Sequence, residues 1–456
     1  MRRTTLALTL ALTTPLAPLS AAAGPAAAPG HGGPGGPIHG TYRVTSGADA
    51  GRGTLRAALE AGYSRFEVAR TVRTIAVEST LEYAGTRELT IDGHGATLAG
   101  DHLRTDLLHV TSGADVTLRD LTLTDGGGWT MDHVATDGED EGSASALHVE
   151  VPAGATGTVD LTLRDVTVDG VAGHGVWVDD NAGSAASVRA SVRDTNVRDS
   201  GTGAFDRDGV RVDETGEGDL VWAGRDNLFT GIGADGVELD ERGAGDAVAT
   251  SRGTAFTDNG TYCLPLADRT DEEELACVED GELDLDDGID VDEADAGSIV
   301  ARVSRATVTG NADEGLDWDE SGTGSVVTDI TRSELSGNRD EGFKTTEEDA
   351  GDVLVTASRT RVHGNLANDG IQLEEDAAGD VHVALHRVEV TDQAEGDGVK
   401  VDEVDAGDLT MLVTRSVFGG NDGQDLDVKQ ADEGAGWLAV VRSGEVDAKA
   451  KGIELR

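Results

Sequence analysis

Short runs of alternating apolar and polar residues recur along most of this chain, and nearly all of them begin at a glycine. In the second half of the chain the runs follow one another at intervals of 27 or 28 residues and start at Gly288, Gly315, Gly342, Gly370, Gly398, Asp425 and Gly452. Alternation with a period of two predicts β-strands, because successive side chains of a strand point to opposite faces. No repeat contains a helical apolar period, so the pattern predicts an all-β array.

Each repeat holds two or three such runs, separated by Gly, Asn and Asp turn residues. A repeat of 27 or 28 residues that contains three short strands predicts one coil of a parallel β-helix. Equivalent residues of successive coils then stack about 4.8 Å apart. Asn311, Asn338 and Asn365 occupy one turn position, where we expect their side-chain amides to pair along the stack.

The head of the array carries the most specific motifs. Residues 53–59 (GTLRAAL) resemble the short capping helix found before many exported β-helices, and Leu89–Ala96 and Val116–Leu123 resemble their first coils. Over about residues 41 to 456 the chain resembles the right-handed parallel β-helix proteins of the pectin-lyase-like superfamily. The resemblance implies a right-handed solenoid of about 12–13 coils with a short N-terminal capping helix. It implies no single activity, because this fold hosts lyases, hydrolases, epimerases, adhesins and inert stalks.

The termini and the interruptions of the repeat define the predicted domains. Residues 1–23 combine Arg2 and Arg3 with an apolar run and small residues, which predicts a signal peptide and a secreted, extracellular protein. Residues 24–40 are rich in Gly and Pro and are interpreted as a linker. The β-helix domain, 41–456, carries insertions at about 124–145 and 261–285. We expect no integral membrane segment. The last strand, which begins at Gly452, has two possible states: it frays, or it pairs end to end with another copy of the chain.

The net charge of the chain limits which kinds of molecule it can bind. The chain has 87 Asp and Glu against 36 Lys and Arg, a formal net charge of −51, which excludes nucleic-acid binding through phosphate neutralisation. The second and fourth residues after each glycine should point outward, and many are acidic; a further acid directly follows the fourth. Eleven arginines are expected to form one column at a different corner: Arg119, Arg164, Arg193, Arg225, Arg252, Arg305, Arg332, Arg359, Arg387, Arg415 and Arg442.

The stacked acids have two compatible interpretations. In one, the columns are structural and keep the protein in solution. In the other, the acids not paired with arginine bind Ca²⁺, which prefers hard oxygen ligands. The proposed ligands are Asp290, Asp292, Asp317 and Asp319. The surrounding sequence matches neither the EF-hand pattern nor the nonapeptide calcium repeat.

Candidate catalytic and sugar-binding residues lie on the same strands. Some β-helix polysaccharide lyases hold Ca²⁺ against a uronate and use Lys or Arg as the base, and Lys344 lies between Asp317 and Gln372 in the predicted stack. Neighbouring carboxylates raise a lysine pKa, which opposes that role, and Lys344 alternatively relieves repulsion among the acids. Trp129, Trp177 and Lys400 are the predicted substrate-binding residues.

Cys263 and Cys277 both fall in the second insertion and predict a disulfide that closes a 15-residue loop, worth about 3 kcal/mol in the entropic model. Together these features predict a secreted scaffold that binds an extracellular polysaccharide or another cell-surface component. The alternative is a Ca²⁺-dependent polysaccharide lyase that acts by β-elimination on a uronate polymer.

Overall fold

The computed structural model describes residues 39–130, 142–263, 278–279, 282–283, 285–431 and 433–456. The predicted signal peptide and nearly all of the predicted linker lie outside the described residues, as do the middle of the first insertion and most of the second. Within the part of the chain that is described, no helix is both long and apolar enough to cross a membrane.

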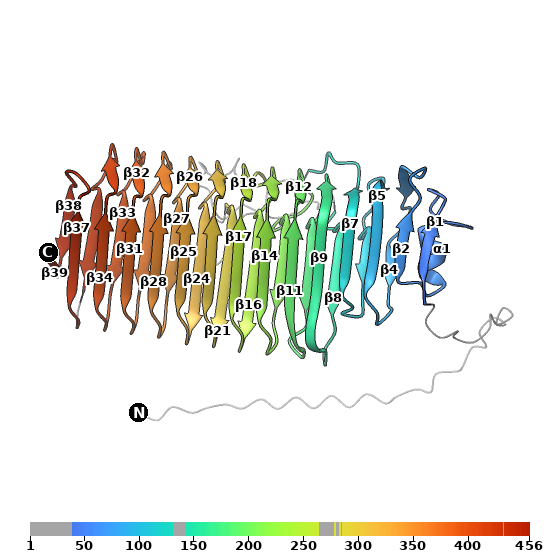
Figure 1. The fold of residues 1–456 in the computed structure, drawn as a ribbon, viewed down its shortest axis with the longest axis horizontal. Coiled ribbons are helices and arrows are strands. Elements are labelled where there is room, and N and C mark those ends of the chain that lie inside the picture. Colours follow the sequence, from blue (N-terminus) through green and yellow to red (C-terminus); the bar gives the residue numbers. More distant parts are fainter. Residues whose placement is uncertain (1–38, 131–141, 264–277, 280–281, 284, 432) are drawn as a thin grey trace, which may run out of the picture. The chain divides into compact units, whose positions relative to one another are not determined.

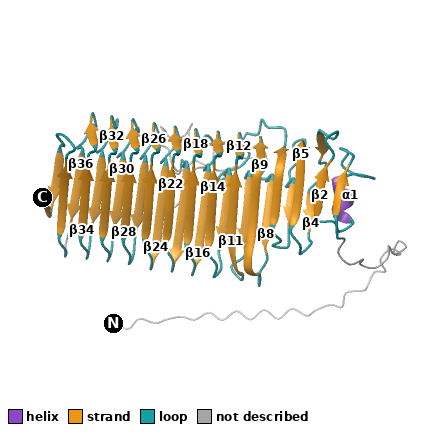
Figure 2. Cartoon of the chain, in the orientation of Figure 1, coloured by secondary structure: helices purple, strands orange, loops and turns teal. Residues whose placement is uncertain are grey.

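The strands of successive coils stack into two long parallel sheets (Figures 1 and 2). The narrow sheet has 13 strands, one per coil, which confirms the predicted all-β, right-handed parallel β-helix of 12–13 coils. Its strands are β4 (Leu81–Tyr83), β6 (Leu108–Val110), β8 (Leu147–Val151), β10 (Val176–Asp180), β13 (Val210–Glu214), β16 (Val237–Gly243), β21 (Ile289–Asp295), β24 (Leu316–Gly322), β27 (Phe343–Glu347), β30 (Ile371–Glu375), β33 (Val399–Glu403), β36 (Leu426–Gln430) and β38 (Ala448–Lys451).

The wide sheet has 24 strands and forms the other two sides of each coil. In the first coils its strands are β1 (Thr41–Val44), β2 (Arg65–Val68), β3 (Thr74–Ala76), β5 (Leu89–Ala99), β7 (Val116–Thr124) and β9 (Thr156–Asp169). Each later coil contributes a longer and a shorter strand: β11 (Ala185–Arg193) and β12 (Asn196–Arg198), β14 (Leu220–Arg225) and β15 (Leu228–Thr230), β17 (Ala247–Arg252) and β18 (Ala255–Thr257), β22 (Ile299–Ser304) and β23 (Thr307–Thr309), β25 (Val326–Thr331) and β26 (Glu334–Ser336), β28 (Val353–Ser358) and β29 (Arg361–His363), β31 (Val381–His386) and β32 (Glu389–Thr391), β34 (Leu409–Thr414) and β35 (Val417–Gly419), β37 (Gly436–Val441) and β39 (Ile453–Leu455).

Two smaller elements lie outside this pattern. Helix α1 (Leu55–Glu60) occupies the segment where the sequence predicts a helix, and the Thr54 hydroxyl caps it by accepting a hydrogen bond from the Ala57 N–H. Its buried side is formed by Leu55, Ala58 and Leu59. In the second insertion β19 (Val278–Glu279) and β20 (Glu282–Leu283) pair antiparallel.

The bore of the solenoid is filled by apolar columns, because equivalent residues pair in register from coil to coil. One buried column of the narrow sheet runs through Val176, Val210, Val237, Ile289 and Leu316. At a turn, the Asn311 side-chain amide donates to Asn338 Oδ1 at 3.0 Å, and that of Asn338 donates to Asn365 Oδ1 at 3.2 Å. The predicted amide stack is therefore confirmed.

Candidate functional site

The outer face of the narrow sheet gathers most of the candidate residues. Because the alternation places the second residue after each glycine outside, those residues form one column across the coils. In register order the column reads Glu82, His109, His148, Trp177, Arg211, Glu238, Asp290, Asp317, Lys344, Gln372, Lys400, Asp427 and Lys449. The face therefore changes in character from aromatic and histidine-rich in the early coils to acidic and then mixed.

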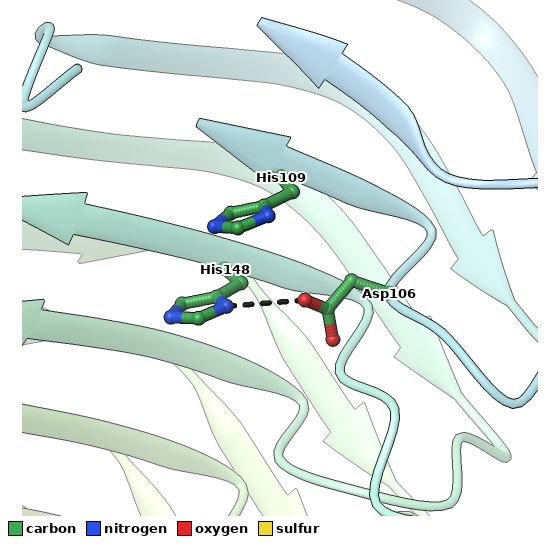
Figure 3. Close-up of side chains that lie close together, drawn as sticks. All are labelled: Asp106, His109 and His148. Carbon is green, nitrogen blue, oxygen red and sulfur yellow. Dashed lines mark hydrogen bonds and ion pairs between the residues drawn. The ribbon is translucent and has the colours of Figure 1, made fainter. Parts of the chain in front are cut away.

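The early part of the face is a stack of rings (Figure 3). His109 and His148 stack with centroids 4.4 Å apart, and His148 stacks on Trp177 with centroids 4.2 Å apart. His148 Nδ1 lies 3.1 Å from Asp106 Oδ2 (Figure 3), and Asp106 Oδ1 accepts a hydrogen bond from the Ser145 N–H. Burial would raise the Asp106 pKa, but these hydrogen bonds outweigh it and hold the pKa below its usual value. Asp106 is thus an ionised group that orients His148.

Further along the face lies a cleft of about 380 Å³, which we call the acidic cleft. Three basic residues line it, Arg211, Arg242 and Lys344. Its ten carboxyl-bearing residues are Asp206, Asp235, Glu238, Asp286, Asp287, Asp290, Asp292, Asp313, Glu314 and Asp317. Three of the predicted calcium ligands, Asp290, Asp292 and Asp317, therefore lie together beside the predicted base. The fourth, Asp319, pairs in register with Asp292 but is not part of the lining.

Ion pairs hold the basic groups of the cleft in place. Lys344 Nζ lies 2.8 Å from Asp317 Oδ2 and 3.0 Å from Glu314 Oε1. At the other end, the Arg211 guanidinium lies 2.5 Å from Glu238 and 2.7 Å from Asp240. Burial alone would lower the pKa of Lys344, but its acidic neighbours raise it above its usual value. The ammonium is therefore firmly protonated.

The remaining acids of the cleft carry an excess of negative charge. Oxygen atoms of Asp287, Glu314 and Asp317 lie within 4.8 Å of one another, and all three residues are buried. Asp317 Oδ1 is buried without a hydrogen-bond partner in the described part of the chain. Burial first, and neighbouring carboxylates second, raise the pKa of Asp290 and Asp292 well above the usual value and that of Asp317 to about 6. Ionising these groups together therefore calls for a cation.

The predicted sugar-binding residues do not meet at one place. Trp129 is only 6% exposed, and it packs against His102 with ring centroids 4.7 Å apart, which leaves little of its ring open to a sugar; its role in substrate binding stays a prediction. Trp177 lies on the outer face, but His148 covers one side of its ring and its Nε1–H donates to Asp213 at 2.6 Å. Lys400 Nζ lies 2.8 Å from Glu374 Oε1.

The cysteine prediction concerns the second insertion. Cys263 is fully buried, and Cys277 lies outside the described residues, so the disulfide stays a prediction.

One set of acids that the sequence placed outside lies inside the solenoid. The fifth residue after each glycine faces inward, and in eight coils it is a buried acid. We call this set the interior carboxyl column: Asp180, Glu214, Glu241, Glu293, Glu320, Glu347, Glu375 and Glu403. The expectation that these acids extend the outer ladder is wrong. The alternation of the strand could have predicted this position. The first, third and fifth residues after each glycine lie on the same, inward-facing side of the strand.

Three members of the interior carboxyl column, Glu214, Glu347 and Glu375, cap the turns that follow them, and neighbouring carboxyl groups of the column pair with one another. Glu347 Oε1 accepts the Asp349 N–H at 3.2 Å, and Glu375 Oε1 accepts the Ala377 N–H at 3.1 Å. Burial first, and the adjacent carboxyl groups second, raise the pKa of Glu241 to about 10 and that of Glu347 and Glu375 to about 8. The column therefore holds protons that carboxyl groups in water release.

The eleven arginines also differ from the prediction, because they form two columns. The first five pair in register: Arg119, Arg164, Arg193, Arg225 and Arg252. Arg252, however, pairs with Ser304, so Arg305 and its successors lie one residue further along the turn. The spacing contained this signal, since Arg252 to Arg305 is 53 residues whereas Gly236 to Gly288 is 52.

Comparison with known proteins adds neither a family nor a function. No protein family matches the chain, and no curated protein matches it.

Similar solved structures share little sequence with the chain. The periplasmic alginate epimerase AlgG is 10% identical, with a TM-score of 0.34 over 86% of this chain and 76% of its own. A lacto-N-biosidase of family GH136 from Eubacterium ramulus is 11% identical, with a TM-score of 0.25 over 91% and 68%. PfbA, a surface adhesin of Streptococcus pneumoniae, is 9% identical, with a TM-score of 0.19 over 85% of each chain. The strand register itself establishes that the chain forms a parallel β-helix.

Proposed function

We propose that this protein is a secreted, non-catalytic scaffold that binds polysaccharide along the sides of its β-helix and holds Ca²⁺ in the acidic cleft. The observation that carries the cation part is the composition of the cleft, ten carboxyl-bearing residues against three basic ones. Ca²⁺ takes six to eight oxygen ligands, mono- or bidentate carboxylates among them. Asp287, Glu314 and Asp317 supply converging oxygens, and Asp290 and Asp292 lie beside them.

The orphaned oxygen of Asp317 supports a bound cation more strongly than the acid count does. Asp317 is 7% exposed, and among the described residues only one of its two oxygens is paired, with Lys344. An uncompensated buried carboxylate oxygen is costly, and a divalent ion would satisfy it. A cation in this position would also present open coordination positions to the hydroxyl or carboxylate groups of a sugar.

A lyase is the second candidate, because Lys344 lies beside the carboxylates that would hold the metal. The protonation state of Lys344 favours the scaffold over the lyase. Its ammonium group forms two ion pairs, and the same acids raise its pKa, so proton abstraction at neutral pH is opposed. On the scaffold proposal, Lys344 relieves repulsion among Glu314, Asp317 and Asp319.

The test is a calorimetric Ca²⁺ titration of the wild type, of the double variant Asp290→Asn/Asp317→Asn, and of Asp427→Asn. Asp427 belongs to the same outer column but lies outside the cleft, so it is a matched control. We expect the wild type and Asp427→Asn to bind Ca²⁺ and the double variant to lose binding. Equal binding by all three proteins would refute the cleft as the site.

The function itself is tested with a panel of neutral and anionic polysaccharides in Ca²⁺ and in chelator. Binding without the ultraviolet absorbance of an unsaturated uronate product supports the scaffold. Appearance of that product, and its loss in Lys344→Met, would instead establish the lyase.

A further inference from the structure

The second arginine column occupies an unusual backbone position. Its six members, which we call the arginine stripe, all have a left-handed backbone with φ between 54° and 58°: Arg305, Arg332, Arg359, Arg387, Arg415 and Arg442. In earlier coils the same corner holds Asp194, Asp226 and Gly253. Glycine adopts this conformation freely and aspartate tolerates it, whereas other side chains disfavour it sterically.

Arginine at this corner in six coils is therefore not explained by the turn. Where a disfavoured conformation persists, the observation leads to a hypothesis of function. Here the backbone preference would be met better by Gly, Asn or Asp, so we look for a requirement on the guanidinium group.

The side chains of the arginine stripe are exposed, and within the described part of the chain none of the six forms an ion pair. The first arginine column behaves differently. Arg164, Arg193 and Arg225 each pair with the aspartate that follows them, at 3.3, 2.9 and 3.0 Å. In the stripe the corresponding neighbours are Ala306, Ser333, Thr360, Val388, Ser416 and Ser443, which carry no charge.

The stripe also lines a groove of about 360 Å³ on the wide sheet. Five arginines border this groove, four of the stripe and Arg361, against two acids, Glu334 and Glu389. Both acids are engaged, Glu389 with Arg361 at 3.4 Å and Glu334 with His363 at 3.2 Å. A protein with a net charge of −51 thus keeps a positively charged groove at one corner.

The acids at the end of β21 and of its equivalents are distant from this corner, because a six-residue strand such as β22 or β25, about 20 Å long, lies between them. The acids before β24, such as Glu314, follow the arginine across the three-residue strand β23, about 10 Å long, and a turn. Because the Debye length at physiological salt is about 8 Å, the field of the far acids is largely screened at the groove.

We propose that the arginine stripe binds a linear anionic polysaccharide, carboxylated or sulfated, that runs along the axis of the solenoid. Guanidinium groups recognise carboxylate and sulfate oxygens through paired, charge-assisted hydrogen bonds. The arginines recur at the coil spacing of about 4.8 Å, close to the length of one pyranose residue in an extended chain. Successive anionic groups of the polymer then meet successive coils. The proposal rests on the polysaccharide-binding function but needs neither Ca²⁺ nor the acidic cleft.

The test compares two triple variants in chelator, which removes any contribution of the cleft. One carries Arg332→Asn, Arg359→Asn and Arg387→Asn; the control carries Arg164→Asn, Arg193→Asn and Arg225→Asn. Asparagine tolerates a left-handed backbone, so we expect the stripe variant to fold, and thermal unfolding checks this. The probes are polygalacturonate, heparin, neutral dextran and single-stranded DNA.

We expect wild type and control to bind the two anionic polysaccharides, with affinity that falls as salt rises, and the stripe variant to bind at least about tenfold more weakly. The stripe proposal would be refuted if both variants bound with equal affinity, or if the wild type bound only dextran. Either result would still be compatible with polysaccharide binding elsewhere on the protein. DNA binding as tight as polysaccharide binding would overturn the assigned ligand class. Absence of binding to every polysaccharide in chelator would refute the stripe proposal, whereas the proposed function would be refuted only if binding were absent in Ca²⁺ as well.

Discussion

The narrow sheet carries two sets of stacked acids, and their positions differ by a single residue. In β21, Asp292 points outward next to the acidic cleft, whereas Glu293 points into the interior carboxyl column. Outside, basic side chains reach the acids, as Lys344 and Arg211 do. Inside, no basic side chain pairs with the column in the described residues, and the acids meet backbone N–H groups and one another.

The comparison shows that the repulsion between stacked carboxylates is relieved in two different ways on the two sides of the same strand. Where cations have access, a basic side chain or a bound ion can hold a carboxylate in its charged form, even where burial raises its pKa. Where both are excluded, the carboxyl group keeps a proton and becomes a hydrogen-bonding group. The two regions should therefore respond differently to pH, to divalent cations and to neutral amide substitution.

The largest expected effect is that of pH on the interior carboxyl column. Its folded-state pKa values, about 10 for Glu241 and 7 for Glu320 and Glu403, exceed that of an unfolded glutamate. The folded chain then binds more protons, so stability is full below about pH 4.5 and falls as pH rises.

Each proton that only the folded state holds lowers the unfolding free energy by about 1.4 kcal/mol per pH unit. Urea denaturation at acidic, neutral and alkaline pH measures this slope. The double variant Glu241→Gln/Glu320→Gln should flatten it, and a wild-type stability that rises toward alkaline pH would contradict the protonated column.

The second largest effect is expected on stability, at Gly324 in the turn that follows β24 and contacts the interior carboxyl column. A Cβ at Gly324 would overlap the carbonyl oxygen of Gly297 and lie 2.6 Å from Glu320 Oε1. We expect Gly324→Ala to cost about 3 kcal/mol or more, because backbone cannot move aside. Gly364→Ala is the control, since its position is left-handed but open, and should cost about 1 kcal/mol. Equal midpoints in urea would show that the turn can relax.

Removal of Ca²⁺ tests the outer acids and should have a smaller effect. A ligand present at a hundred times its Kd stabilises a protein by about 2.7 kcal/mol, so chelation should lower the Tm. Asp290→Asn/Asp317→Asn should abolish the difference between Ca²⁺ and chelator, whereas Glu320→Gln, inside the solenoid, should preserve it. An unchanged Tm of the wild type on chelation would argue against calcium in the cleft.

The smallest expected effect is a difference in stability between substitutions at two adjacent residues, Glu347 and Glu348. Glu347 is buried in the column and Glu348 is exposed. At alkaline pH, Glu347→Gln should stabilise the fold by about 1 kcal/mol, because an amide keeps the turn hydrogen bond without the buried charge. Glu348→Gln should change little. The chain itself ends the column with Gln430, whose Oε1 accepts the Leu409 N–H at 2.9 Å. A loss of stability in Glu347→Gln would indicate that a charged column is needed.

Several details of the fold and the site could be predicted because a repeat with constant spacing fixes its own register. Lys344 does lie between Asp317 and Gln372, as counting from the glycines predicts. The amide stack through Asn338 follows from the same count. Across the insertion between Arg252 and Arg305 the strands keep an offset of 52 residues, but the arginine lies one residue later, so the predicted single arginine column was wrong.

The sequence by itself determined the coil, the number of coils and which residues stack, because hydrophobic alternation and turn residues act locally and repeat. Only the tertiary structure decided the environment of each stacked group: Glu293 among carboxyls in the interior, Asp290 in an open cleft, Trp129 buried, and Arg332 exposed with no acidic partner among the residues described. Solvent access and the distance to a counter-charge depend on how the corners of successive coils pack. These properties set the pKa and binding capacity of each group, and composition does not encode them.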